Sequence, residues 1–471
     1  MLHHAHRVLH VSLLCLGLGL HTAAHVQTLP VTAGPALAAA KPKLIGPMVG
    51  AVTMRSARVW TQVQSLKSGT TVSVWLEYQA LNESGQPIGD VVQTKPQLLS
   101  AQQSTASWLL DQLQAGTPYQ YKVLWGRKGD IQSSQLQRLQ TEALWQWRRN
   151  PPPVKILASS CAYTNDAQTD RPGTPYGQST AIFESMAQRK PDVTLWMGDS
   201  VYFRETDADD RSAMAQRYDQ WRALPAMQSL LQTGRHLATW DDHDFGPNDS
   251  NSSNTSKDIS LELFKQYWVN PSHGMPGLPG VFTQTRASDV EFFILDNRWY
   301  RDSDKLVDDD RQMLGAGQLR WLKNALTAST ATWKFVVTGS QVLNLQNGFE
   351  GWHQFPKEQQ AFLGWLEQQR IPGVMLLSGD RHFSVLLKKD RPHLYPLYEL
   401  TCSPTTARPY QNPVKDLKNN DAIVQGTAVT QNNFCELEVT GSQGHRNLRV
   451  SMRDVNGQEI WARNIEESEL R

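Results

Sequence analysis

The sequence predicts an α/β fold in which two sheets lie between helices, an α/β/β/α arrangement, preceded by a small β-sandwich. Residues from about 43 to 142 carry alternating and β-branched apolar runs, which are typical of strands. From Val154 onward apolar strands and amphipathic helices alternate, and their mixed pattern favours packed sheets over a simple doubly wound sheet. At 471 residues the chain exceeds one compact core, so we expect more than one domain.

We predict that residues 41–145 form a sandwich like those of immunoglobulin or fibronectin type III domains. The strand-like runs are VGAVTMRSARVWTQV and TTVSVWLEYQA, separated by Lys-Ser-Gly. The segment around Tyr119 and Tyr121 resembles a tyrosine corner, in which a Tyr hydroxyl binds an upstream backbone group. We expect a structural module here. Three prolines, residues 151–153, mark a linker before the second domain, residues 154–471.

The second domain shows helical and strand patterns in turn. Apolar residues at helical spacing predict helices within 179–190, 212–232, 258–270, 316–326 and 357–369. The helix in 212–232 should break near Pro225, and that in 258–270 should stop at Pro271. Strands are expected within 291–302 and 333–341, and hairpins with an Asn-Gly turn within 427–466.

The first forty residues predict a signal peptide. Arg7 precedes VSLLCLGLGL, an apolar run of about ten residues that fits a secretory signal and is too short to cross a bilayer. We expect cleavage after Ala40, with Ala24 as the alternative, and export to the periplasm or the exterior. No other run is apolar enough to span a membrane. The net charge of +1 creates no field that favours nucleic acid, and we expect a monomer without a nucleic-acid partner.

Removal of the signal peptide leaves three of the four cysteines. Cys402 and Cys435 can pair in an oxidising compartment, with Cys161 as the odd thiol. A small core residue is the alternative interpretation of Cys161.

Four apolar runs end in side chains that bind hard metal ions. These are VKILASSC with Cys161, PDVTLWMGDSVY with Asp199 and Tyr202, RHLATWDDHD with Asp241, Asp242 and His243, and GVMLLSGDRH with Asp380 and His382. Strand ends of an open α/β sheet converge on one crevice, so we expect a single site. Oxygen ligands with one thiolate suit Fe(III), Ca²⁺, Mg²⁺ or Mn²⁺ better than copper, which predicts metal-assisted hydrolysis.

The individual roles follow from side-chain chemistry. Asp199, after Gly198, can bridge two cations, and Tyr202 can bind a strongly Lewis-acidic ion such as Fe(III) as a phenolate. A packed aromatic is the alternative for Tyr202. We assign Asp242 to the second cation with Asp241 assisting, and we expect His243 to contact an anionic substrate or protonate a leaving group.

The segments SCAY, GDSVY, WDDHDFGPN, LDNRWYRD and SGDRHFS together resemble the alkaline phosphatase D (PhoD-like) family of the calcineurin-like metallophosphatase superfamily. The resemblance implies a metallophosphatase sandwich in residues 154–471. It implies Fe(III) on Cys161, Asp199, Tyr202 and His382, and Ca²⁺ on Asp199, Asp242 and Asp380, with Mg²⁺ or Mn²⁺ as alternatives. Family members commonly carry a twin-arginine leader, and this leader has no Arg pair.

The expected function is hydrolysis of phosphate monoesters, and of diesters as a further reaction, by a water activated between two cations that share Asp199. Arg204, with Arg298 or Arg301, is predicted to clamp the phosphate oxygens, the alternative for each being a structural salt bridge. One competing interpretation is a phosphodiesterase resembling phospholipase D that acts on phospholipid or nucleotide diesters. The other is an exported, non-enzymatic protein that binds anions or glycans.

Overall fold

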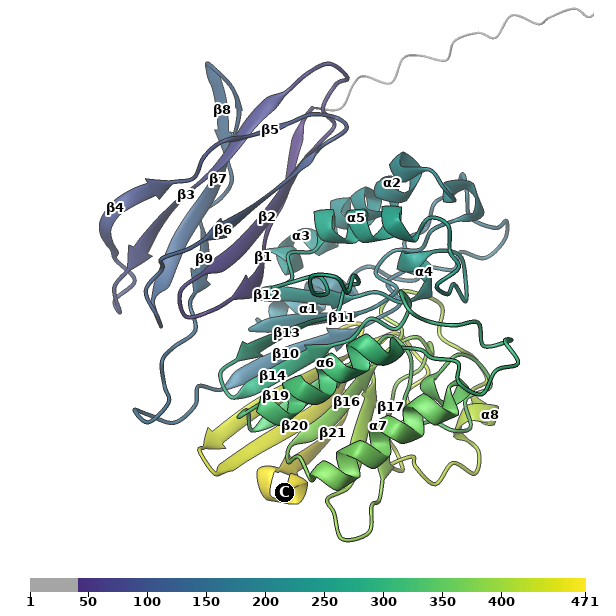
Figure 1. Ribbon diagram of the computed structural model, residues 1–471. Coiled ribbons are helices and arrows are strands. Elements are labelled where there is room, and N and C mark those ends of the chain that lie inside the picture. Colours follow the sequence, from purple (N-terminus) through teal and green to yellow (C-terminus); the bar gives the residue numbers. More distant parts are fainter. Residues whose placement is uncertain (1–40) are drawn as a thin grey trace, which may run out of the picture. The chain divides into compact units, whose positions relative to one another are not determined.

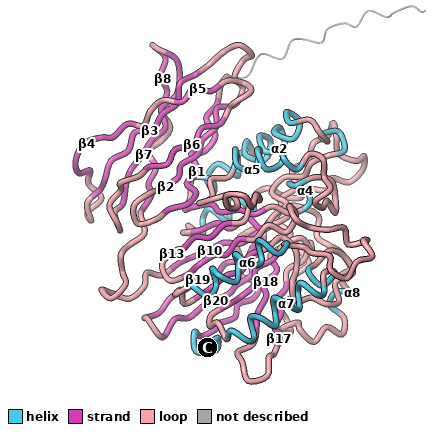
Figure 2. The backbone as a smooth tube through the Cα atoms, in the orientation of Figure 1, coloured by secondary structure: helices cyan, strands magenta, loops and turns pink. Residues whose placement is uncertain are grey.

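The computed structural model describes residues 41–471, apart from the side chains of residues 414 and 415. The predicted signal peptide and both predicted cleavage sites lie outside these residues. Residues 43–140 consist of strands and loops (Figure 2). The strands are β1 (Lys43–Val52), β2 (Ala57–Gln64), β3 (Val72–Leu81), β4 (Pro87–Gln93), β5 (Gln97–Leu99), β6 (Thr105–Leu110), β7 (Pro118–Arg127), β8 (Asp130–Ser133) and β9 (Gln137–Gln140).

These strands form two packed sheets. One contains β1, β2 and β6, and the other has the order β4-β3-β7-β8, with β5 and β9 paired to β3 and β7. Alternate residues of β3 and β7 are buried, as expected for a sheet with one face in a core. Val59, Val74 and Trp108 belong to the shared core. The Tyr119 hydroxyl accepts a hydrogen bond of 2.8 Å from the Gln114 N–H, so Tyr119 makes the bond of a tyrosine corner. The immunoglobulin or fibronectin identity stays a prediction.

Two large sheets dominate the described residues, and the nine-stranded one includes β1, β2 and β6 of the sandwich. The nine-stranded sheet has the order β21-β20-β19-β10-β11-β12-β1-β2-β6, and the six-stranded sheet has the order β13-β14-β15-β16-β18-β17. Their further strands are β10 (Val154–Ser159), β11 (Val193–Met197), β12 (Arg235–Thr239), β13 (Thr283–Ala287), β14 (Val290–Ile294), β15 (Trp333–Val337), β16 (Val374–Ser378), β17 (Val385–Lys389), β18 (Leu397–Thr401), β19 (Asn433–Ser442), β20 (His445–Asp454) and β21 (Glu459–Glu466).

The helices occupy every predicted range, and they include two short ones, at residues 242–245 and 414–417, that were not predicted. They are α1 (Ile182–Gln188), α2 (Arg211–Ala223), α3 (Pro225–Leu231), α4 (Asp242–Phe245), α5 (Lys257–Tyr267), α6 (Gly315–Ala328), α7 (Pro356–Gln369) and α8 (Val414–Leu417), with short 3₁₀ turns at Glu205–Asp207, Trp352–Gln354 and Glu467–Leu470. Asp210 caps α2 by accepting bonds from the Ser212 and Ala213 N–H groups. Pro225 separates α2 from α3, where it takes the first helical position.

Burial on both faces of each central strand produces the layers. In β11, Leu195 faces the core between the two sheets, whereas Trp196 faces a second core with Phe183 of α1 and Phe264 of α5. A third core packs α6 and α7 against the six-stranded sheet (Figure 1). The order is therefore helices, sheet, sheet, helices, and the predicted α/β class with two central sheets is confirmed.

A disulfide joins Cys402, which follows β18, to Cys435 in β19, with 5.7 Å between their Cα atoms. It links the six-stranded sheet to the nine-stranded sheet, and it realises the pairing that the sequence left open. Cys161 remains a buried free thiol. None of the helices in residues 41–471 combines the length and apolar character that a membrane span requires.

Candidate metal centre

The predicted metal-binding side chains follow strands that end at one edge of the two sheets. Cys161 follows β10, Asp199 follows β11, Asp241 follows β12 and Asp380 follows β16. The strands β10, β11 and β12 are parallel neighbours, and β16 is parallel to β15 and β18 in the facing sheet. Parallel strands present their carboxyl ends together, so the four tips converge as the sequence predicted.

The backbone turns sharply at these tips. Cys161, Asp199, Asp380 and His382 have φ angles of 58°, 53°, 69° and 53°, in the left-handed region that non-glycine residues seldom adopt. Such conformations cost about 1–3 kcal/mol each and persist where surrounding structure holds them. Gly198 permits close approach of two tips, because a Cβ there would lie 2.6 Å from the Asp241 Cβ. These strained backbone conformations lower the stability of the fold, and they direct the candidate ligand side chains toward one another.

Potential ligand atoms form three overlapping groups, each with its atoms within 4.8 Å of one another. The groups are Cys161, Asp199 and His382; Asp199, Asp242 and His243; and Asp242, Asp249 and Glu350. Asp199 belongs to the first and second groups, and Asp242 to the second and third. The structure therefore brings Cys161, Asp199, Asp242 and His382 together from distant parts of the chain. Their roles as ligands stay predictions.

The first group is compact and includes Tyr202. The Cys161 Sγ lies 3.6 Å from the Asp199 Oδ2, and the Tyr202 hydroxyl lies 3.3 Å from the same oxygen. The Tyr202 hydroxyl is also 3.5 Å from the His382 Nε2. Thiolate, carboxylate, phenol and imidazole atoms thus surround one point, as expected for a site that holds a single cation.

Neighbouring groups orient the ligand atoms of this first group. The His382 Nδ1 donates to the Arg408 carbonyl over 2.7 Å, which leaves its Nε2 without a proton and directed at Tyr202. The Ser403 hydroxyl donates to the Cys161 Sγ over 3.1 Å. Metal-binding His and Cys residues are commonly fixed by such outer hydrogen bonds.

The WDDHD segment supplies the second group. The His243 Nε2 lies 3.9 Å from the Asp242 Oδ2, and the His243 backbone N–H donates to the Asp199 Oδ1 over 3.3 Å. The His243 ring packs 4.2 Å from the Tyr202 ring and keeps 23% of its side chain exposed. The position of His243 therefore suits either a ligand or, as predicted, a group that meets the substrate.

Charge in the centre is unevenly balanced. Burial, and then the charges of Asp242 and Cys161, raise the pKa of Asp199 well above its usual value. Burial raises the pKa of Asp380 to about 8 and that of the Cys161 thiol to about 12. Burial acts against ionisation of Asp242, yet nearby positive charge lowers its pKa to about 2. The positive charges of His243 and then Arg298 oppose the effect of burial on Asp242, and burial in turn lowers the pKa of His243.

The predicted phosphate clamps already have partners inside the protein. Arg298 is fully buried, and it binds Asp241, the two oxygens of Glu350 and the Ser250 carbonyl. With these bonds no donor of Arg298 remains for a substrate oxygen. Arg301 is 1% exposed and pairs with Glu350 over 2.8 Å. Arg298 therefore matches the structural salt bridge that the sequence left open as an alternative, whereas the buried Arg301 Nη1 has no hydrogen-bond partner among the described residues.

Arg204 is likewise engaged. It binds the Asp170 carboxylate and the Thr164 carbonyl, and its guanidinium lies 4.2 Å from the centre of the Tyr163 ring. It also donates to the Tyr202 carbonyl, so it fixes the backbone of a candidate ligand. Arg204 positions the centre from outside, and its guanidinium is 7% exposed.

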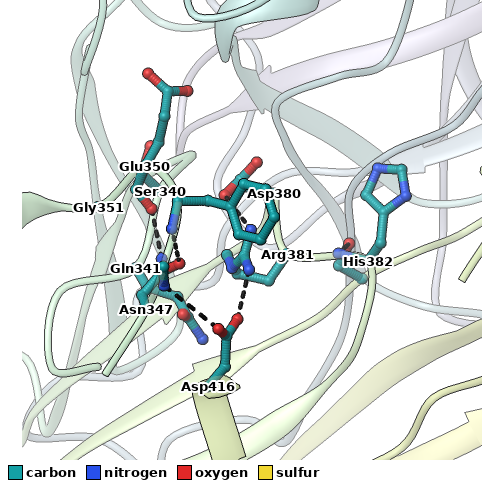
Figure 3. Close-up of polar contacts among 12 residues, drawn as sticks. Ser340, Gln341, Asn347, Glu350, Gly351, Asp380, Arg381, His382 and Asp416 are labelled. Atoms are coloured by element: carbon teal, nitrogen blue, oxygen red, sulfur yellow. Dashed lines mark hydrogen bonds and ion pairs between the residues drawn. The ribbon is translucent and has the colours of Figure 1, made fainter. Parts of the chain in front are cut away.

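Several residues of the centre were missed by sequence reasoning. Glu350 and Asp249 complete the third group, and Arg381 links the Asp380 tip to Asp416. Figure 3 shows the Arg381 side chain extending toward Asp416, while the neighbouring His382 points away from it. Glu350 and Asp249 lie in loops that follow no apolar run, whereas Arg381 lies within the recognised segment SGDRHFS, where the sequence assigned it no role. Asp249 was near a recognised motif as well, in the polar tail after WDDHD.

The donor set fits hard cations. The Asp241 Oδ2, the Asp380 Oδ2 and the Asn297 Oδ1 are buried without a hydrogen-bond partner among the described residues. Buried acceptors of this kind normally find a donor or a cation. Together with one thiol, imidazole nitrogens and carboxylates, they form a set of candidate ligands for hard cations, and the identity of those cations as Fe(III), Ca²⁺, Mg²⁺ or Mn²⁺ stays a prediction.

The fold and these side chains define an α/β protein with a candidate multinuclear metal centre. Residues 280–458 match the family model described as PhoD-like phosphatase. Alkaline phosphatase D of Bacillus subtilis (strain 168) is 24% identical over 260 residues, 44% of this chain and 44% of that protein, so the match spans less than half of the curated relative. A solved structure of PhoD superposes with a TM-score of 0.70 at 17% identity, over 89% of this chain and 88% of that chain.

These findings confirm the expected resemblance to the PhoD-like phosphatases, which holds in sequence for residues 280–458 and in fold for most of the chain. The family-model match includes β16, Asp380 and His382, whereas Cys161, Asp199 and Asp242 lie before it. The structural likeness extends over both parts and establishes the fold.

Proposed function

We propose that this protein is an exported, metal-dependent phosphoric ester hydrolase that acts on small phosphate monoesters and diesters. One observation carries the proposal. Asp199 is shared by two adjacent groups of ligand atoms, one with Cys161 and His382 and the other with Asp242 and His243. A carboxylate between two cation positions is the arrangement that two-metal phosphoryl chemistry uses.

Each side chain has a distinct task in this proposal. When bound, the cations would supply Lewis acidity that lowers the pKa of water and neutralises charge on phosphate oxygens. Cys161, Tyr202 and His382 would hold one cation, while Asp242, with Asp380 and Asp241, would hold the other. The partly exposed His243 ring would contact a phosphate oxygen or carry a proton at Nε2 to the leaving group. Arg204 and Arg298 would position Tyr202 and Asp241, not the substrate.

The remaining expectations belong to the same proposal. We propose that residues 41–145 form a structural module, that residues 154–471 form the catalytic domain, and that the protein acts as a monomer without a nucleic-acid partner. The Cys402–Cys435 disulfide supports export, because disulfides persist in oxidising compartments.

The decisive experiment combines metal analysis of purified protein with phosphatase assays before and after chelation. We expect bound iron or another hard cation, hydrolysis of an aryl phosphate, loss on chelation and recovery when metal is restored. Parallel assays of a monoester and a diester decide which class is preferred. A metal-free protein that still bound anions or glycans unchanged would instead favour the non-enzymatic interpretation.

Tyr202 provides a separate test of the first cation position. If this cation is Fe(III), its phenolate should give a visible charge-transfer band, and Tyr202→Phe should lose the band while iron remains measurable. An iron-containing oxidised protein without colour would show that Tyr202 is not a ligand.

A further inference from the structure

An exposed aromatic ring lies beside the candidate metal ligand His382. Tyr176, in the loop between β10 and α1, keeps 37% of its surface exposed. Its ring centre is 5.8 Å from that of His382, and its hydroxyl is 3.3 Å from the His382 Nδ1. If a phosphate ester binds at the metal centre, its organic group would therefore contact the Tyr176 ring close to the phosphorus atom.

The loop that carries Tyr176 is firmly held. The Asn165 side chain makes two hydrogen bonds to the backbone of Gly177, at 2.8 and 2.9 Å. The Tyr176 ring meets Tyr163 edge-on at 4.8 Å, and Tyr163 is itself 4.8 Å from Tyr202. The Tyr163 hydroxyl donates to Asp170 over 2.7 Å. The exposed ring is thus preorganised, which lowers the entropy cost of binding a group against it.

A cationic group lies close to the same ring. The Arg408 guanidinium carbon is 5.6 Å from the Tyr176 ring centre, and its Nη2 donates to the Thr174 and Pro175 carbonyls. The Arg408 carbonyl is the group that orients His382. The Tyr176 ring, the Arg408 guanidinium and the candidate ligand His382 are therefore close neighbours.

We propose that Tyr176 determines specificity by stacking against a planar, aromatic group of the phosphate ester. The proposal rests on the proposed hydrolase function and names the substrate class of that site: aryl or nucleoside-like esters in preference to alkyl esters. Offset or edge-on packing of two aromatic rings stabilises a complex beyond the area that it buries. A rigid aromatic surface beside Arg408 provides such packing, and saturated groups of equal size gain less from it.

Non-hydrolysable inhibitors test this without interference from leaving-group reactivity. Inhibition constants of phenylphosphonate and cyclohexylphosphonate would be measured with the metal-loaded full chain. We expect the phenyl compound to bind about two- to tenfold more tightly. Tyr176→Phe should keep this ratio, and Tyr176→Leu should bring it close to unity. Metal content would be measured for each variant, because the Tyr176 hydroxyl lies near His382.

Trp147→Ala is the matched control, since Trp147 is an aromatic residue that is 95% exposed in the linker. Its ratio should equal that of the wild type. An unmodified enzyme that hydrolyses phosphate esters but shows no preference for the phenyl compound overturns the role of Tyr176 alone. A preference for the phenyl compound that remains in Tyr176→Leu also overturns the role of Tyr176 alone. Absence of both hydrolysis and inhibition in the metal-loaded protein overturns the proposed function, and this inference with it.

Discussion

The two sides of the acidic centre neutralise their charge in different ways. On one side, Glu350 and Asp241 face Arg298 and Arg301, so the chain supplies its own cations. On the other side, Asp199 has no Lys or Arg ion pair among residues 41–471, and Asp380 has only Arg381 at 3.8 Å. The first side receives positive charge from two arginines of the chain, whereas the second has little of its own and depends more on cations from solution. The difference predicts which carboxylates depend most on bound cations.

Asp199→Asn tests the side that needs cations, and it should have the largest effect. It removes the carboxylate shared by the first two ligand groups. We expect phosphatase activity to fall by at least about 100-fold, with loss of bound metal and a protein that remains folded. Turnover, metal content and circular dichroism measure this. Asp390→Asn, at a side chain that is 82% exposed, is the control. Retained turnover in the Asp199 variant would remove the bridging role.

A matched pair of substitutions tests the contrast itself in the metal-free protein. Glu350→Gln leaves Arg298 and Arg301 without their carboxylate, which should cost about 3–5 kcal/mol of unfolding free energy. Asp380→Asn removes a buried charge that lacks a close partner, so at pH 9 it should stabilise the metal-free protein by about 1–3 kcal/mol. Urea unfolding measures both changes. The contrast fails if both variants shift stability in the same direction.

The pH dependence of the unfolding free energy of the metal-free protein should also show that the charge of Asp380 is poorly compensated. The pKa of Asp380 is raised to about 8 in the folded protein, from a usual value of 3.8. The folded state therefore keeps a proton that the unfolded chain releases, and stability falls as pH rises from about 4 to 8, by about 5 kcal/mol. Thermal unfolding with and without Ca²⁺ measures this, and the cation should flatten the profile. A metal-free protein whose stability rose over this range would contradict it.

His236 in the helix-facing core provides a smaller effect of opposite sign. Its Nδ1 accepts from Trp196, its Nε2 donates to the Leu230 carbonyl, and burial lowers its pKa to about 4. The unfolded chain gains a proton on this group below about pH 6.5, so stability falls by about 2 kcal/mol by pH 5. His236→Gln keeps one donor and one acceptor and should reduce that loss. The pKa of His273 is also lowered to about 4, so part of the loss of stability in acid should remain in the His236 variant. An unchanged acid profile in the variant would exclude His236 as a source.

The sequence predicted those features that depend on local pattern. Apolar runs located the strands, and the polar residues that follow them located Cys161, Asp199, Asp242 and His382. Helix limits followed from apolar spacing and from Pro225. Each of these signals lies within a few residues of the feature that it marks, so a single chain suffices to recognise it.

Features that depend on distant partners were not predicted. The expected roles of Arg204 and Arg298 depended on whether their donors were free, and the partners Asp170 and Glu350 lie far away or in loops. Glu350 itself lies between β15 and α7 without an apolar run before it. Nothing local distinguishes such a residue from any solvated glutamate, because only the packing of two loops buries it.

The nine-stranded sheet has a practical consequence for shortened versions of this protein. Val49 of β1 pairs in parallel with Arg235 of β12, and the Ala51 N–H donates to the Val269 carbonyl. A fragment that started at Val154 would leave the outer side of β12 with unsatisfied amides. An exposed edge strand of this kind pairs readily with other chains, so the fragment should self-associate during expression even though every proposed ligand is present.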